Sequence, residues 1–288
     1  MTQIIRAAKS GFCFGVRQAI EKTEEQIVKN KDGKQIYTMG QLIHNSLVTD
    51  DLAARDVQIL DDLEKATPDD IIIVRSHGEG KSFWEEAEQR NLNVVDATCP
   101  FVSKIHRLVY EASRSGHDII IVGDEDHPEV KGIKGWCDGK AFVVDSAEKA
   151  RALTGDDFFI VCQTTIKKEI LDCVIEALDE NKKIYTVRNT ICSATAERQE
   201  NCKSLAAECD GMVIIGGKNS SNTRKLYEIS KKICQNTYFV EKIEDLPLQG
   251  LSKCNKIGVA AGASTPECVI KEVIAAMSDH ITEKNEMN

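Results

Sequence analysis

The sequence predicts an α/β protein built from three similar units, each a parallel sheet covered by helices. Short apolar runs that suit strands recur along the 288 residues, and amphipathic segments that suit helices separate many of them. Such alternation is typical of parallel sheets. Three of the runs lead within a few residues into a cysteine that opens a helical segment, and these cysteines are spaced 86 and 93 residues apart. This recurrence indicates an internal threefold repeat.

The expected strands are short and rich in isoleucine and valine. In chain order they are QIIRAA, QIYTMG, IIIVRS, NVVDA, IIIVGD, FFIVCQ, KIYTV, MVIIGG and KIGVAAG. The three cysteines are Cys13, Cys99 and Cys192, and helices are expected to follow them over 14–27, 100–112 and 193–208. Pro100 directly follows Cys99, and proline suits the first turn of a helix.

These elements predict units at 1–98, 99–191 and 192–281, followed by a polar tail at 282–288. In open α/β sheets, ligands bind beyond the carboxyl ends of the strands. If the three units pack around a pseudo-threefold axis, their cysteines and polar loops can converge on one central cavity.

Two polar loops follow each cysteine at matching distances. The loops 28–31 residues beyond the cysteines carry His44, then His127 and Glu129, then Ser220, Ser221 and Asn222. The loops 64–72 residues beyond carry His77, then Thr164 and Thr165, then Ser264. Histidines at loop tips suit anion binding or proton transfer, and serine and asparagine at the start of a helix suit an anion.

Each of these residues also has an ordinary structural interpretation. A free cysteine is usually a small buried hydrophobe, and serine and asparagine favour helix N-caps. Glu129 could be a solvated loop charge, and Thr164 a helix cap. The other eight cysteines fit structural roles, with Cys137 and Cys254 the least clear.

The three recurring cysteines have the chemistry of a metal site. A helix N-terminus favours the thiolate, which is the form that binds metal. Three thiolates suit a four-iron cluster with one iron left without a protein ligand. A structural zinc site with His127 or His44 as its fourth ligand is the alternative.

Composition narrows the class of protein. The net charge of −9 argues against a nucleic-acid or anionic-membrane partner, which would favour a basic face. We find no transmembrane stretch and no signal peptide, and therefore expect a cytoplasmic protein.

Taken together, the motifs are similar to those of the 4-hydroxy-3-methylbut-2-enyl diphosphate reductases of the methylerythritol phosphate isoprenoid pathway. The matching segments run from residue 11 to residue 266: GFCFGV, GQLIHN, VRSHG, DATCP, GDEDHPEV, QTT, TICSATAERQ, KNSSN and AGASTP. The resemblance implies a trefoil of three α/β units around a central iron–sulfur cluster.

The resemblance also implies roles for individual residues. It assigns ligation of one [4Fe-4S] cluster per chain, with one open iron, to Cys13, Cys99 and Cys192. It makes Glu129 the proton-relay acid and has Thr164 contact the substrate hydroxyl. The diphosphate is expected among His44, His77, His127, Ser220, Ser221, Asn222 and Ser264.

The implied reaction is reductive dehydroxylation of the allylic diphosphate to isopentenyl and dimethylallyl diphosphate. It consumes two electrons and two protons, with reduced ferredoxin or flavodoxin as donor, and we expect a monomer. Two rival functions use the same cysteines: a redox-neutral iron–sulfur hydratase or dehydratase, and a non-catalytic metal-binding sensor. A requirement for an electron donor separates the first rival, and absence of turnover the second.

Overall fold

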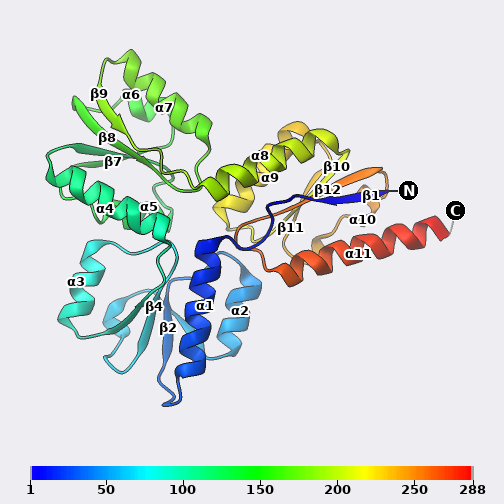
Figure 1. Ribbon diagram of the computed structural model, residues 1–288, viewed down its shortest axis with the longest axis horizontal. Helices are drawn as coiled ribbons and strands as arrows, with labels where there is room; N and C mark the ends of the chain where they lie inside the picture. The colour runs from blue at the N-terminus through cyan, green and yellow to red at the C-terminus, as the bar shows by residue number, and fades with distance from the viewer. Residues whose placement is uncertain (1, 287–288) are drawn as a thin grey trace. The chain divides into compact units, whose positions relative to one another are not determined.

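Three parallel sheets of four strands each make up the β structure of residues 2–286, which the computed structural model describes (Figure 1). The first has the order β3-β2-β4-β5, with strands Val57–Leu60, Ile36–Met39, Ile71–Val74 and Asn93–Asp96. The second has the order β7-β6-β8-β9, with strands Ala141–Val144, Asp118–Val122, Asp157–Cys162 and Ile184–Val187. The third has the order β11-β10-β12-β1, with strands Thr237–Val240, Gly211–Ile215, Lys256–Ala261 and Gln3–Arg6. Three sheets of matching order confirm the predicted three-unit α/β fold.

The third sheet differs from the predicted sequence units in one strand. In the first two sheets the fourth strand is the one that leads to the next cysteine, namely β5 before Cys99 and β9 before Cys192. In the third sheet β1, which leads to Cys13, takes this place and pairs with β12, with Gln3 beside Lys256. Residues 3–6, expected within the unit 1–98, therefore lie in the sheet of residues 211–261.

The helices follow the strands in regular alternation. Their bounds are α1 Phe14–Lys29, α2 Ser46–Ala54, α3 Lys81–Gln89, α4 Pro100–Arg114, α5 Pro128–Lys134, α6 Ala147–Arg151, α7 Lys168–Glu180, α8 Ser193–Glu208, α9 Ser221–Ile233, α10 Leu248–Leu251 and α11 Glu267–Glu286, with short 3₁₀ turns at Leu63–Lys65 and Ile243–Asp245. As predicted, α1, α4 and α8 each begin directly after one of the three cysteines. The expected polar tail at 282–288 continues α11 as far as Glu286, and its last two residues lie outside the described part of the chain.

Period-two alternation explains how helices cover both faces of a sheet. In β6, Ile119 and Ile121 pack against α4 and α5, whereas Ile120 and Val122 pack against α6 and α7. All four are fully buried. The third sheet repeats this pattern with α8 and α9 on one face and α11 on the other. Strands buried on both faces read as continuous apolar runs, which is why the central strands were recognisable in the sequence.

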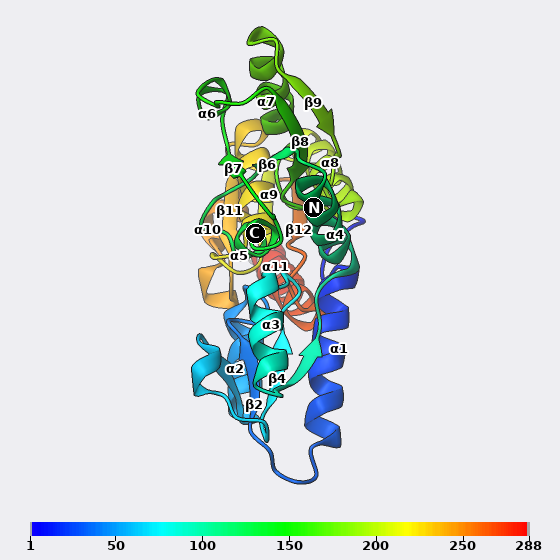
Figure 2. The same cartoon turned by 90° about the vertical axis from the view of Figure 1, so that its left-hand side faces the viewer.

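The chain forms two units with dense internal contacts. One comprises Met1–Val16, Ile43–Asp50 and Ser193–Asn288, and contains the third sheet. The other comprises Arg17–Leu42 and Asp51–Cys192, and contains the first two sheets. Within it, α1 runs alongside β2 and β4 in both views (Figures 1 and 2), and its Ala19 and Thr23 are fully buried. Over the described helices, none is long and apolar enough to cross a membrane.

Candidate functional site

The three helix-opening cysteines share one backbone arrangement. The N–H of Cys13 donates to the carbonyl of Ala263, at 3.1 Å, directly before Ser264. The N–H of Cys99 donates to the carbonyl of Ser76, at 3.0 Å, directly before His77, and that of Cys192 to the carbonyl of Thr164, also at 3.0 Å. Each cysteine is thus tied to the second polar loop of the preceding repeat, so these three loops are structurally equivalent.

The cysteine side chains are accessible and oriented by helix starts. All three thiols are partly exposed. Cys99 is the N-cap of α4, and the N–H of Val16 lies 3.5 Å from the sulfur of Cys13. Helix N-terminal N–H groups favour a thiolate.

The other cysteines divide into two groups. Burial raises the pKa of Cys162 to about 12 and that of Cys202 to about 11, as expected for structural thiols. Burial also raises the pKa of Cys137 to about 12. Cys254, whose role the sequence left unclear, is buried in the core. Cys173 and Cys268, in contrast, are exposed on their helices and are not part of the core.

Glu129 and Thr164 form a buried pair in the larger unit. The backbone N–H of Thr164 donates to Oε1 of Glu129 at 2.5 Å, and the Thr164 hydroxyl lies 2.7 Å from Oε2. Glu129 is only 2% exposed, so it is not the solvated loop charge of the ordinary interpretation. Burial raises the pKa of its carboxyl, and the Thr164 bonds oppose this rise. A carboxyl kept protonated at higher pH is suited to donate a proton.

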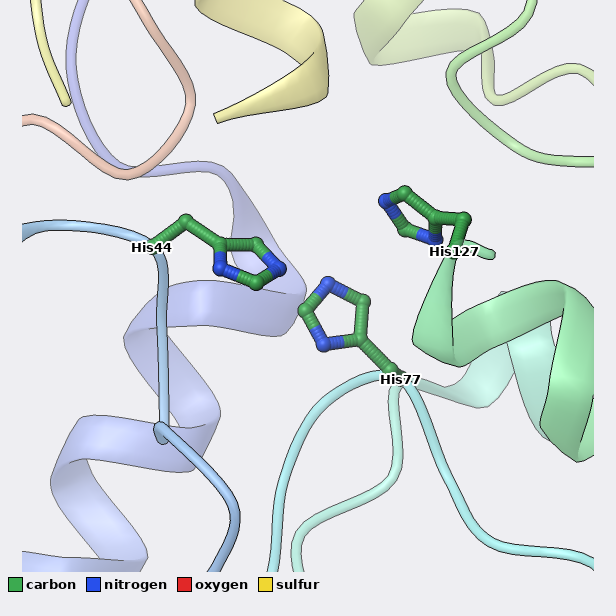
Figure 3. Close-up of side chains that lie close together, drawn as sticks. All are labelled: His44, His77 and His127. Carbon is green, nitrogen blue, oxygen red and sulfur yellow. The ribbon is translucent and has the colours of Figure 1, made fainter. Parts of the chain in front are cut away.

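Two histidines lie beside this pair. His127 is the N-cap of α5, and its Nδ1 accepts the backbone N–H of Glu129 at 3.2 Å. Accepting at Nδ1 leaves Nε2 to carry the proton of a neutral ring. The rings of His77 and His127 meet edge to face with centroids 5.3 Å apart (Figure 3). Figure 3 also labels His44, which belongs to the other unit.

In that other unit, three polar segments meet at Ser264. Its hydroxyl lies 3.4 Å from both the His44 carbonyl and the Ser220 hydroxyl. A Cβ at Gly217 would stand 2.3 Å from the His44 carbonyl, so only glycine fits there. Ser220 is the N-cap of α9, as its ordinary interpretation predicted.

Asn222 gives this place the character of a ligand site. The side chain is 4% exposed, yet neither Nδ2 nor Oδ1 has a hydrogen-bond partner within the described part of the chain. Buried amides are nearly always paired, and the first turn of α9 favours anions. The partner that Asn222 lacks is therefore expected to be a bound ligand. Ser221, next to it, is partly exposed at the start of α9.

Comparison with known proteins shows where this arrangement occurs. The family model described as "LytB protein" matches residues 4–278. The chain belongs to the LytB family. A 4-hydroxy-3-methylbut-2-enyl diphosphate reductase of Caldanaerobacter subterraneus subsp. tengcongensis is 44% identical to this LytB chain over 278 residues, covering 94% of this chain and 95% of the relative. A protein of the same name from Clostridioides difficile is 37% identical, over 95% and 98% of the two chains.

Solved structures agree with the LytB assignment. A structure titled as (E)-4-hydroxy-3-methyl-but-2-enyl diphosphate reductase, the terminal enzyme of the non-mevalonate pathway, superimposes with a TM-score of 0.72 at 39% identity, covering 97% of this chain and 100% of the other. The Plasmodium falciparum E-1-hydroxy-2-methyl-but-2-enyl-4-diphosphate reductase superimposes with a TM-score of 0.89 at 28% identity, covering 95% and 87%.

Two buried residues of the LytB motifs had no role in the sequence interpretation. Gln163 is fully buried, and its amide accepts the Asp124 N–H and donates to the Thr165 hydroxyl, which joins two site loops. Arg198 is 7% exposed and donates to the carbonyl of Gly11. Both stand in segments that matched the family, QTT and TICSATAERQ, and that match was the available signal.

Proposed function

We propose that this LytB protein is a 4-hydroxy-3-methylbut-2-enyl diphosphate reductase that forms isopentenyl and dimethylallyl diphosphate. The observation that carries the proposal is the buried Glu129–Thr164 pair beside His77 and His127. An acid whose pKa is raised by burial, a hydroxyl relay and anion-binding imidazoles suit removal of a hydroxyl from an allylic diphosphate. The names of the relatives supply the substrate.

The donor set fits an iron–sulfur cluster. Cys13, Cys99 and Cys192 are partly exposed thiols at three helix starts, and thiolates are the ligands that iron–sulfur clusters use. We propose that they hold one [4Fe-4S] cluster with one iron free of protein ligands. When bound, such a cluster supplies single electrons and a Lewis acid.

The protein's own residues hold the substrate and move protons. Nε2 of His127, His77, and the Asn222 amide would donate to the diphosphate oxygens, as would His44, Ser220, Ser221 and Ser264 from their loops. This fixes the charged end of the substrate, away from the reacting carbon.

Glu129 and Thr164 would form the proton path. Protonated Glu129 can donate from Oε2 to the Thr164 hydroxyl, 2.7 Å away, and that hydroxyl can donate in turn to the substrate hydroxyl. Burial of Glu129 keeps its proton available for this transfer. We propose reduced ferredoxin or flavodoxin as the electron donor to a cytoplasmic monomer.

The test is anaerobic purification followed by iron and sulfide analysis, a visible spectrum and turnover of the allylic diphosphate with dithionite and a viologen. About four irons and substrate consumption only with reductant are expected. Turnover without reductant would instead favour the hydratase, and zinc without a visible band would favour a structural metal site.

A further inference from the structure

Arg198 is a buried cation on α8, the helix that begins directly after Cys192. Its Nη1 donates to the carbonyl of Ala194 at 3.0 Å and its Nη2 to the carbonyl of Gly11 at 2.9 Å. Its Nε is buried and has no hydrogen-bond partner among residues 2–286. The guanidinium is therefore held by neutral groups and retains an unused donor.

Six other arginines of the chain pair with carboxylates. The ion pairs include those of Arg6, Arg55, Arg75, Arg90, Arg107 and Arg151. For Arg198 the described residues provide no such pair, and its neighbour Glu197 pairs with Lys9 at 3.3 Å. Arginine keeps its charge in proteins, and buried charges are normally paired. The negative partner of Arg198 is thus missing from the protein part of the structure.

The position of Arg198 indicates which anion would complete the pair. Gly11 stands two residues before Cys13, and Ala194 two residues after Cys192. The guanidinium therefore ties together the segments next to two of the three proposed cluster ligands. A cluster held by three thiolates carries negative charge, and its reduction adds more.

We propose that Arg198 is a positioning residue whose charge compensates the thiolate-bound cluster and raises its reduction potential. This inference rests on the proposed function, because it requires the cluster. Charge near a cluster and hydrogen bonding around it are among the factors that set its potential. A residue that merely fastened the Gly11 loop to α8 would leave the potential unchanged.

The test is an anaerobic redox titration of the cluster-loaded protein, followed by visible absorption and electron paramagnetic resonance. In Arg198→Gln the ratio of reduced to oxidised cluster at a fixed potential should fall about tenfold, which corresponds to a midpoint about 59 mV more negative for a one-electron couple. Arg198→Lys, which keeps the charge, should stay close to the wild type. Arg6→Gln removes an exposed arginine paired with Glu267 in the same unit, and should leave the midpoint unchanged.

An unchanged midpoint in Arg198→Gln would overturn the inference, as would equal shifts in the Gln and Lys variants. If Arg198→Gln does not take up iron, loading of Arg198→Lys with a midpoint near the wild type supports the charge. If neither variant takes up a cluster, the role of Arg198 is only to hold the Gly11 loop against α8. A wild-type protein without any cluster would instead refute the proposed function itself.

Discussion

At the scale of single residues, the buried amide of Asn222 finds no hydrogen-bond partner among the described residues. A buried amide without partners costs about 1–3 kcal/mol of stability, and both polar atoms of Asn222 are in this condition within the described residues. Substrate binding would recover that cost. Stability and affinity are therefore opposed at this position.

Replacing Asn222 should separate the two quantities. We expect Asn222→Leu to raise the free energy of unfolding by about 1 kcal/mol and to weaken binding of inorganic diphosphate at least about tenfold. Urea unfolding and calorimetry measure these changes. Asn201→Leu is the control, because Asn201 is partly exposed on α8 and its amide donates to the Glu197 carbonyl. Equal diphosphate affinity in Asn222→Leu and the wild type would count against the binding role.

Glu129 should give the protein a characteristic pH dependence. Burial raises the pKa of its carboxyl above the ordinary 4.5, so the folded state binds this proton more tightly than the unfolded chain does. Its contribution to stability is complete below pH 4.5 and is lost as pH rises through the raised pKa. Glu129→Gln cannot ionise, so its stability relative to the wild type should increase with pH across that window, by at most about 1.4 kcal/mol per pH unit.

The same substitution should lower turnover about 10²–10⁴-fold, because the proton donor is lost, while diphosphate binding is retained. Urea unfolding at several pH values and steady-state kinetics measure the two effects. Glu125→Gln, on the exposed part of the same loop and paired with Lys134, should change neither. A Glu129→Gln enzyme with wild-type turnover would remove Glu129 from the proton path.

At the scale of elements, the two central strands and one edge strand of each sheet were predictable, whereas the other edge strand was not. The strands β3, β7 and β11 escaped the sequence analysis, and each is a four-residue strand at the edge of its sheet. In β3 the polar Gln58 interrupts the apolar run that identifies a strand, and both Gln58 and Ile59 are exposed. The loop residues were found because they recur with the cysteines, whereas the burial of Glu129 and Arg198 depends on packing that no local pattern records.

The turn after β4 illustrates a packing requirement between elements. Gly78 has a φ of +71°, and a Cβ there would lie 2.6 Å from Cε1 of His106 on α4 and 2.9 Å from Cγ2 of Thr98. The same imidazole stacks on Trp136, and burial lowers its pKa to about 4. An uncharged, buried ring thus supports the turn that carries His77.

Gly78→Ala should therefore lower the free energy of unfolding by more than backbone strain alone would. Gly33 is the matched control, because its φ is +67° and a Cβ there would meet nothing within 4 Å. Each substitution should lose about 1–2 kcal/mol to left-handed strain, and Gly78→Ala about 1–3 kcal/mol more to overlap. Urea unfolding gives both values. Equal losses would mean that His106 yields without cost.

At the scale of the whole molecule, the proposed cluster ligands Cys13, Cys99 and Cys192 are distant in sequence. Only the folded chain can bring the three thiolates together, so the unfolded chain offers no complete site. Binding only to the folded state stabilises it. Loading should raise the unfolding midpoint by roughly 5 °C or more. Anaerobic calorimetry before and after iron chelation measures this difference. Cys99→Ser should abolish it, whereas Cys173→Ser, at an exposed free thiol outside the proposed ligands, should retain it. A loading effect that survives in Cys99→Ser would exclude Cys99 as a ligand.

The pairing of β1 with β12 limits when the third sheet can close during synthesis on the ribosome. Gln3 is made about 250 residues before its sheet neighbour Lys256. At about 5–20 residues per second, roughly 10–50 s pass between the two events. During that interval the first two sheets can form from complete sets of strands, whereas the third cannot close. The nascent chain therefore carries β1 unpaired until β12 has been translated, and anything that binds β1 during this interval would block closure of the third sheet.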